Sequence, residues 1–104
     1  MSFPSRISDL PAFDGPFDAH RLAARGCDVL FATYPAGTTV ADHDHDTHNV
    51  GVIVEGELIL TLDGRESRHG PGQWYEVPRN TVHAARFEVA TCEIEFWFQD
   101  GGAT

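Results

Sequence analysis

Short β-type runs separated by turn residues fill most of this 104-residue chain from residue 28 onward. Turn signals at intervals of about 8–12 residues are typical of antiparallel sandwiches and barrels. Asp63-Gly64 is a strong hairpin signal between two of the runs. No long helical period interrupts the pattern, so we predict an all-β, antiparallel domain. The expected strands cover residues 29–34, 38–42, 49–54, 58–62, 65–69, 74–77, 82–89 and 91–99.

The chain is long enough for one domain with one core. Residues 1–27 are rich in Pro, Asp and Gly and have little periodicity. We interpret them as a lead-in that supplies an edge strand or a dimer arm, with a short extended piece or helical turn at 5–10 and at 19–22. The predicted barrel covers residues 28–99, and residues 100–104 are expected to form a flexible tail.

The formal net charge is −9, with 16 acidic residues against 7 basic ones. An anionic surface repels nucleic-acid phosphates and anionic lipid headgroups, so we expect no nucleic-acid and no membrane partner. No apolar run approaches the roughly 20 residues that span a bilayer. The first residues also lack the apolar stretch of a signal peptide. We therefore expect a cytoplasmic location.

The last predicted strand has two unlike faces, because successive side chains of a strand point in opposite directions. Glu93, Glu95 and Trp97 share one face, which is either exposed to solvent or lines a polar cavity. If it lines a cavity, Glu93 and Glu95 are candidate catalytic bases. The other face is apolar and consists of Cys92, Ile94, Phe96 and Phe98.

Three of the six histidines lie within residues 42–49. His43 and His45 are two positions apart, so in a strand they point to one face and can converge on one ion. His83 lies far along the chain, on a strand that a barrel can place beside them. Three neutral imidazoles with one open position form a catalytic rather than a structural metal site. We predict one divalent ion (Zn, Fe, Ni or Mn), the alternative being a solvated polar loop.

The spacing of these residues resembles the two conserved boxes of the cupin family. The first box has glycine, five residues, His-x-His, three or four residues, glutamate, six residues and glycine. It is matched by Gly37, His43, His45, Asn49 and Gly56. The second box has glycine, five residues, proline, one residue, glycine, two residues and histidine. It is matched by Gly72, Pro78, Asn80 and His83.

The resemblance covers residues 28–99. It implies the cupin-type double-stranded β-helix, a jelly-roll barrel that holds a metal ion in its interior. It also implies a small-molecule ligand and a homodimer, since small single-domain cupins usually pair.

Two residues depart from the family pattern. Asn80 replaces the second-box glycine, and the turn should survive because Asn tolerates the left-handed conformation. Asn49 replaces the anionic glutamate and is similar to the glutamine variant of small cupins that act on sugar acids. Strand parity places Asn49 on the face of His43, whereas a bulge at 46–47 would bring His48 inward. Asn49 or water is favoured as the fourth ligand, with His48 as the alternative.

A neutral ligand set leaves the charge of the ion uncompensated, which favours acidifying a bound water or binding an anionic substrate. We therefore expect a metal-dependent enzyme that acts on a small polar, anionic metabolite. Its chemistry would be isomerase, lyase or ring-opening chemistry on a sugar acid, or Fe-dependent dioxygenase chemistry. The alternative is a non-catalytic ligand-binding or sensor cupin, which the neutral Asn49 leaves open.

Overall fold

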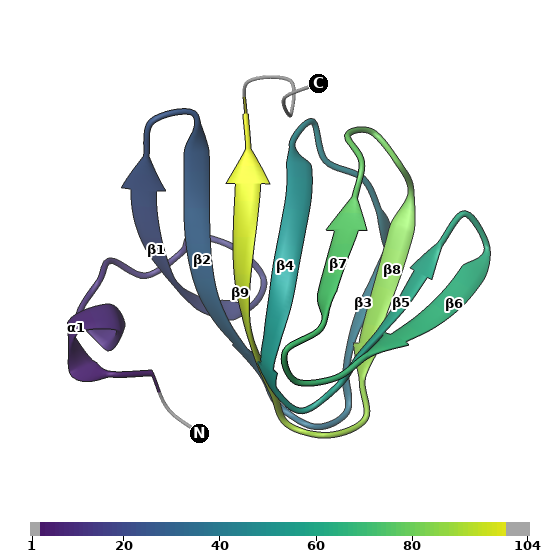
Figure 1. Cartoon of the computed structure of the whole chain (residues 1–104), viewed down its shortest axis with the longest axis horizontal. Coiled ribbons are helices and arrows are strands. Elements are labelled where there is room, and N and C mark those ends of the chain that lie inside the picture. The colour runs from purple at the N-terminus through teal and green to yellow at the C-terminus, as the bar shows by residue number, and fades with distance from the viewer. Residues whose placement is uncertain (1–2, 100–104) are drawn as a thin grey trace.

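The computed structural model describes residues 3–99, which form one short helix and nine strands in two antiparallel sheets (Figure 1). The helix α1 covers Ser5–Ser8. Sheet A has the order β1-β2-β9-β4-β7, with the bounds Asp18–Ala24, Cys27–Tyr34, Thr91–Phe98, His48–Glu55 and Trp74–Val77. Sheet B has the order β3-β8-β5-β6, with the bounds Thr38–His43, His83–Phe87, Leu58–Leu62 and Arg65–His69. The prediction of an all-β, antiparallel fold is confirmed.

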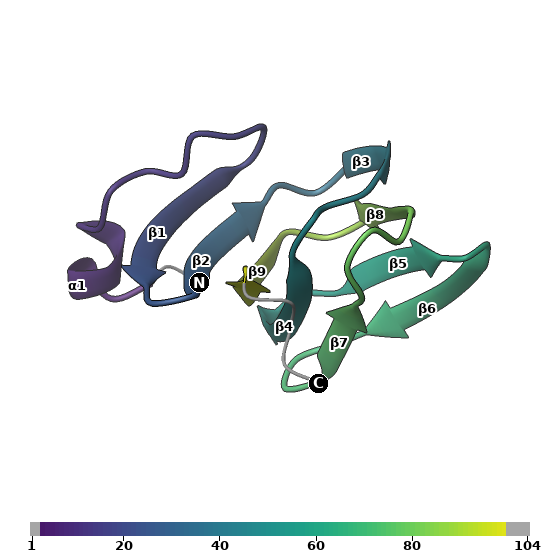
Figure 2. The ribbon, with the colours of Figure 1, turned by 90° about the horizontal axis from the view of Figure 1, so that it is seen from above.

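The core lies between the two sheets, and both sheets contribute to it. Seen from above, β5 and β6 of sheet B lie at the opposite end of the molecule from α1 and β1 (Figure 2). Alternation directs one side of each strand inward, so the inner faces supply one apolar cluster. Its buried members are Ala19, Leu30, Ala32, Tyr34, Ile53, Leu58, Leu60, Val77 and Phe87.

The lead-in contributes more regular structure than its sequence pattern indicates. Strand β1 pairs with residues 27–33 of β2, from Asp18 opposite Thr33 to Ala24 opposite Cys27, and so forms an edge of sheet A. The expected tail at residues 100–104 lies outside the described residues. Within residues 3–99, no helix is long and apolar enough to cross a membrane.

Strand β3 contains an irregularity that decides which side chains point inward. Val40 pairs with Ala85 and His43 pairs with His83, so β3 advances three residues while β8 advances two. The extra residue is a β-bulge, which inverts the alternation beyond it. Because Val40 faces the interior, strict alternation would direct His43 outward. The bulge turns His43 inward, and β3 ends there, so His45 belongs to the following loop.

Candidate metal centre

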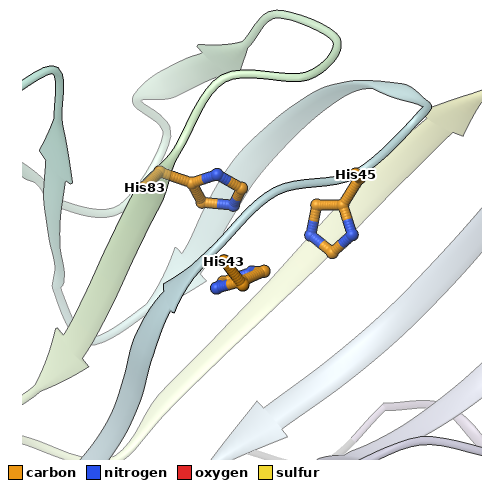
Figure 3. A group of neighbouring side chains, drawn as sticks. All are labelled: His43, His45 and His83. Atoms are coloured by element: carbon orange, nitrogen blue, oxygen red, sulfur yellow. The ribbon is translucent and has the colours of Figure 1, made fainter.

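The three histidines singled out in the sequence converge at one end of the space between the sheets (Figure 3). His43 ends β3, His83 begins β8, and His45 lies in the loop that leads to β4. Their candidate ligand nitrogens all lie within 4.8 Å of one another. The ring centroids are 4.2 Å apart for His43 and His83, 4.7 Å for His43 and His45, and 5.2 Å for His45 and His83.

Backbone carbonyls hold two of these rings in one orientation. The Nδ1 atom of His43 lies 2.7 Å from the carbonyl oxygen of Ala41, and that of His83 lies 2.9 Å from the carbonyl oxygen of Thr81. A carbonyl only accepts, so Nδ1 carries the proton in both rings and Nε2 keeps its lone pair. Metal-binding histidines are usually fixed through their second ring nitrogen in this way.

The loop that carries His45 is fixed to the turn before β8. The backbone N–H of Asn80 donates to the carbonyl oxygen of His45 at 2.7 Å. Asn80 has a φ of 58°, within the left-handed region, as its replacement of the family's glycine predicts. The expectation that Asn preserves this turn is therefore confirmed.

The protonation of the rings suits a metal ion. Burial, together with the neighbouring His43 and His83, lowers the pKa of His45 to about 4. Burial also lowers the pKa of His83. Both rings are neutral at neutral pH and offer lone pairs without first losing a proton. The donor set therefore fits a divalent metal ion.

The two candidates for the fourth ligand lie on opposite faces of β4. Asn49 is buried, lines the same pocket as the histidines, and accepts a hydrogen bond from the Thr47 hydroxyl at 2.7 Å. His48 lies on the outer face, where its imidazole pairs with the Glu76 carboxylate. Residues 46–47 form a bend before β4 and do not bring His48 into the pocket.

Beyond the histidines the pocket extends between the sheets, with a volume of about 400 Å³. That volume is within the range of small-molecule sites. Most of the wall is aromatic or aliphatic. The aromatic part consists of Phe13, Phe17, Tyr34, Tyr75, Phe87 and Trp97. Trp74 and Phe96 lie outside this wall and stack on one another with centroids 6.2 Å apart.

Two carboxyl groups also line the pocket. Their positions show whether the polar face of the last strand, β9, meets solvent or a cavity. Glu93 and Glu95 are 1% and 6% exposed, so their face of β9 borders a cavity and not solvent. Glu95 accepts hydrogen bonds from the Tyr34 hydroxyl at 2.6 Å and from Trp97 Nε1 at 2.9 Å. Glu93 accepts a hydrogen bond from the Tyr75 hydroxyl.

Burial raises the pKa of Glu93 well above its usual range, and the negative charge of Glu95 raises it further. The charge of Glu95 disfavours ionisation of Glu93, so Glu93 keeps its proton to a higher pH than an exposed glutamate does. Burial also raises the pKa of Tyr34 and of Tyr75. Both tyrosines therefore remain neutral phenols that donate to the carboxyl pair.

Sequence reasoning missed two residues of the pocket wall. Phe13 and Phe17 come from the segment before β1, and their ring centroids lie 5.0 Å apart. Phe13 packs edge-on against Trp97 at 5.7 Å, and Phe17 packs against Tyr34 at 5.3 Å. Phe13 and Phe17 are two of the three phenylalanines in the lead-in, and aromatic residues in a segment rich in Pro, Asp and Gly are a signal that could have indicated this contact.

A small antiparallel barrel with three converging histidines at one end of its interior is the arrangement of a metal-binding cupin. The cupin domain family (Cupin_2) matches residues 30–98. The chain therefore belongs to the cupin family.

Two curated relatives match part of the chain. Quercetin 2,3-dioxygenase of Bacillus subtilis is 36% identical over 61 residues, which are 58% of this chain and 18% of that protein. The HTH-type transcriptional regulator PuuR of Escherichia coli is 32% identical over 68 residues, which are 64% of this chain and 37% of that protein. The chain thus spans well under half the length of either relative.

Solved structures with this fold include KdgF from Halomonas sp., with a TM-score of 0.76 and 20% identity. The superposition covers 88% of this chain and 88% of KdgF. At this level of identity the likeness concerns the fold.

Proposed function

We propose that this cupin is a metal-dependent enzyme in which His43, His45 and His83 hold one divalent ion. The observation that carries the proposal is the convergence of three imidazoles at one end of the pocket, two of them held with Nε2 unprotonated. Asn49 or a water molecule completes the ligand set. An ion held by neutral ligands would polarise a substrate carbonyl or acidify a bound water.

The carboxyl pair supplies the acid–base chemistry in this proposal. One carboxyl group of the pair would accept a proton from a substrate, while Glu93, whose pKa is raised, would return one. Tyr34, Tyr75 and Trp97 hold the pair in place through their hydrogen bonds. A group that keeps a proton near neutral pH suits isomerase, lyase or ring-opening chemistry, in which protons are moved between carbon and oxygen atoms.

The proposed substrate is a small polar metabolite whose anionic end binds at the histidines. Asn49 supports a sugar acid as the substrate, because it resembles the glutamine that small cupins acting on sugar acids have at this position. The relative from Bacillus subtilis is a dioxygenase, and that similarity supports oxygen chemistry with iron as a second possibility within the same site. The identity of the native metal decides between these chemistries.

A sensor role is the second candidate function. PuuR is a transcriptional regulator, and the region that matches this chain is about a third of it. A regulator needs only ligand binding, for which the neutral Asn49 in place of an anionic ligand would suffice. In this case the pocket would bind its ligand without converting it.

We also propose a cytoplasmic homodimer. The outer face of sheet A carries apolar side chains along most of its strands, and two of them are prominently exposed: Leu22 at 45% and Trp74 at 58%. A second copy of the chain would cover this face, as small cupins usually pair. The acidic net charge disfavours nucleic acids and anionic membranes as partners.

Elemental analysis of the freshly purified protein, combined with a turnover screen of sugar acids, keto acids and diketones, tests the proposed function. We expect close to one equivalent of metal per chain and conversion of at least one substrate class. Stoichiometric metal with ligand-induced thermal stabilisation and no turnover would favour the sensor. Absence of metal after reloading with Zn, Fe, Ni and Mn would contradict the metal site itself.

A further inference from the structure

We infer that the carboxyl pair Glu93–Glu95 is a second recognition element in the pocket, which selects ligands that carry an O–H or N–H donor at the end away from the histidines. The ligand class is therefore a bipolar molecule. It has chelating oxygens at one end, a flat or apolar body, and a hydroxyl or ammonium group at the other. The part of this inference that concerns the chelating oxygens rests on the proposed metal site. The part that concerns Glu93 and Glu95 does not.

One side chain, Trp97, contacts both recognition elements, the histidines and the carboxyl pair. The Trp97 ring lies 4.7 Å from the His45 ring, and its Nε1 atom donates to Glu95 at 2.9 Å. His45 and Glu95 thus contact the same indole, and the histidines and the carboxyl pair border the same pocket. A small ligand can reach both.

The carboxyl pair has more acceptor positions than the protein fills. Each carboxylate offers about four lone-pair positions. Glu95 receives two donors from side chains and Glu93 receives one. A ligand hydroxyl or ammonium group can occupy the remaining acceptor positions.

No cationic side chain among the described pocket-lining residues neutralises the charge of the pair. No Arg is among the pocket-lining residues of the described chain, and the sequence contains no Lys. A buried charge without a counter-ion favours a cationic or donor group and strongly disfavours a second anion. A ligand carboxylate or phosphate is therefore excluded from this end of the pocket, although an anion fits at the histidines.

The wall between the two ends favours a flat body. Tyr34 stacks on Phe87 with centroids 4.0 Å apart and an interplanar angle of 9°. Phe17 packs against Tyr34, and Phe13 packs against Trp97. Aromatic rings and the apolar faces of sugar rings both pack well on such surfaces.

A matched series of 4-substituted catechols tests the inference, because the catechol oxygens chelate a metal while the opposite substituent varies. The probes are 3,4-dihydroxybenzyl alcohol, 3,4-dihydroxybenzylamine, 3,4-dihydroxybenzoate and 4-methylcatechol. Their affinities are measured by calorimetry with the zinc-loaded and the metal-free protein. We expect the alcohol and the amine to bind at least tenfold more tightly than the benzoate, and 4-methylcatechol to lie between.

In Glu95→Gln, and in the double variant that also carries Glu93→Gln, the difference in affinity between the alcohol or amine and the benzoate should shrink to less than threefold. Glu76→Gln, which changes a carboxylate on the outer face, should leave it intact. A wild-type protein that binds the benzoate as tightly as the alcohol overturns the inference, whether or not the variants fold. Failure to load zinc would instead contradict the proposed metal site, while a preference for donors in the metal-free protein would still support the carboxyl end.

Discussion

His43 and His83 are register partners on β3 and β8, and their ring centroids lie 4.2 Å apart. This relationship depends on the β-bulge after Val40, because regular alternation would direct His43 to the outer face. The bulge is thus a structural requirement of the site and not an imperfection of the sheet. It brings together two residues that are far apart along the chain.

Replacement of either histidine should remove the metal. We expect His43→Ala and His83→Ala to lower metal affinity by more than the 10–100-fold that the loss of an outer-sphere partner typically costs. His48→Ala is the matched control, because His48 lies next to Asn49 but pairs with Glu76 on the outer face. Metal content after dialysis against a weak chelator measures the effect. Loss of metal in His48→Ala would instead favour His48 as a ligand.

The sequence predicts the strands well because turn residues interrupt β-type runs, and it predicts the histidine cluster because the motif spacing is specific. It does not predict the β-bulge that turns His43 inward, since a bulge leaves no signal in the alternation pattern. It also leaves the environment of Glu93 open. An alternating strand has the same pattern whether its polar face meets water or a cavity, and only the packing of Tyr34, Tyr75 and Trp97 decides this.

The buried carboxyl pair should make stability depend on pH. The pKa of Glu93 is raised in the folded state, so between the unfolded value of about 4.5 and the folded value the folded protein holds the extra proton. The contribution of the protonated Glu93 to the stability of the folded protein is therefore lost as the pH rises through this window. Gln has no proton to lose, so the stability of Glu93→Gln relative to wild type should increase from pH 5 to pH 8.

Urea unfolding of the metal-free proteins at several pH values measures this difference. Glu88→Gln, on the exposed link between β8 and β9, controls for the removal of one carboxylate. A difference between Glu93→Gln and wild type that stays constant with pH would show that Glu93 holds no extra proton in the folded state.

Gly51 allows Tyr75 to reach the carboxyl pair. The two residues are register partners on β4 and β7, and a Cβ atom at position 51 would lie 2.3 Å from the Tyr75 ring. We expect Gly51→Ala to displace this ring, to break its hydrogen bond to Glu93, and to cost about 1–3 kcal/mol of stability as overpacking does. Gly70→Ala is the control, because the nearest atom there is 3.7 Å away. Equal melting temperatures for both variants would contradict this account.

Asn80 should be replaceable by glycine but not by alanine. Its φ of 58° is left-handed, which costs a residue with a Cβ roughly 1–2 kcal/mol unless its side chain suits that region. Asn80→Gly should therefore keep both stability and metal affinity. Asn80→Ala should lower the melting temperature and weaken metal binding, because the Asn80 N–H holds the carbonyl of His45. Thermal unfolding with and without zinc separates the two effects.

The outer face of sheet A should control the oligomeric state. Trp74 is 58% exposed and stacks on Phe96, which leaves an aromatic surface open to a second copy. Trp74→Glu should place a charge in that interface and shift the protein from dimer to monomer, as light scattering after size-exclusion chromatography would measure. Val89→Glu is the matched control, since Val89 is 50% exposed but lies outside sheet A. A monomeric wild type would contradict the proposed dimer, and a dimer that persists in Trp74→Glu would assign the interface to another surface.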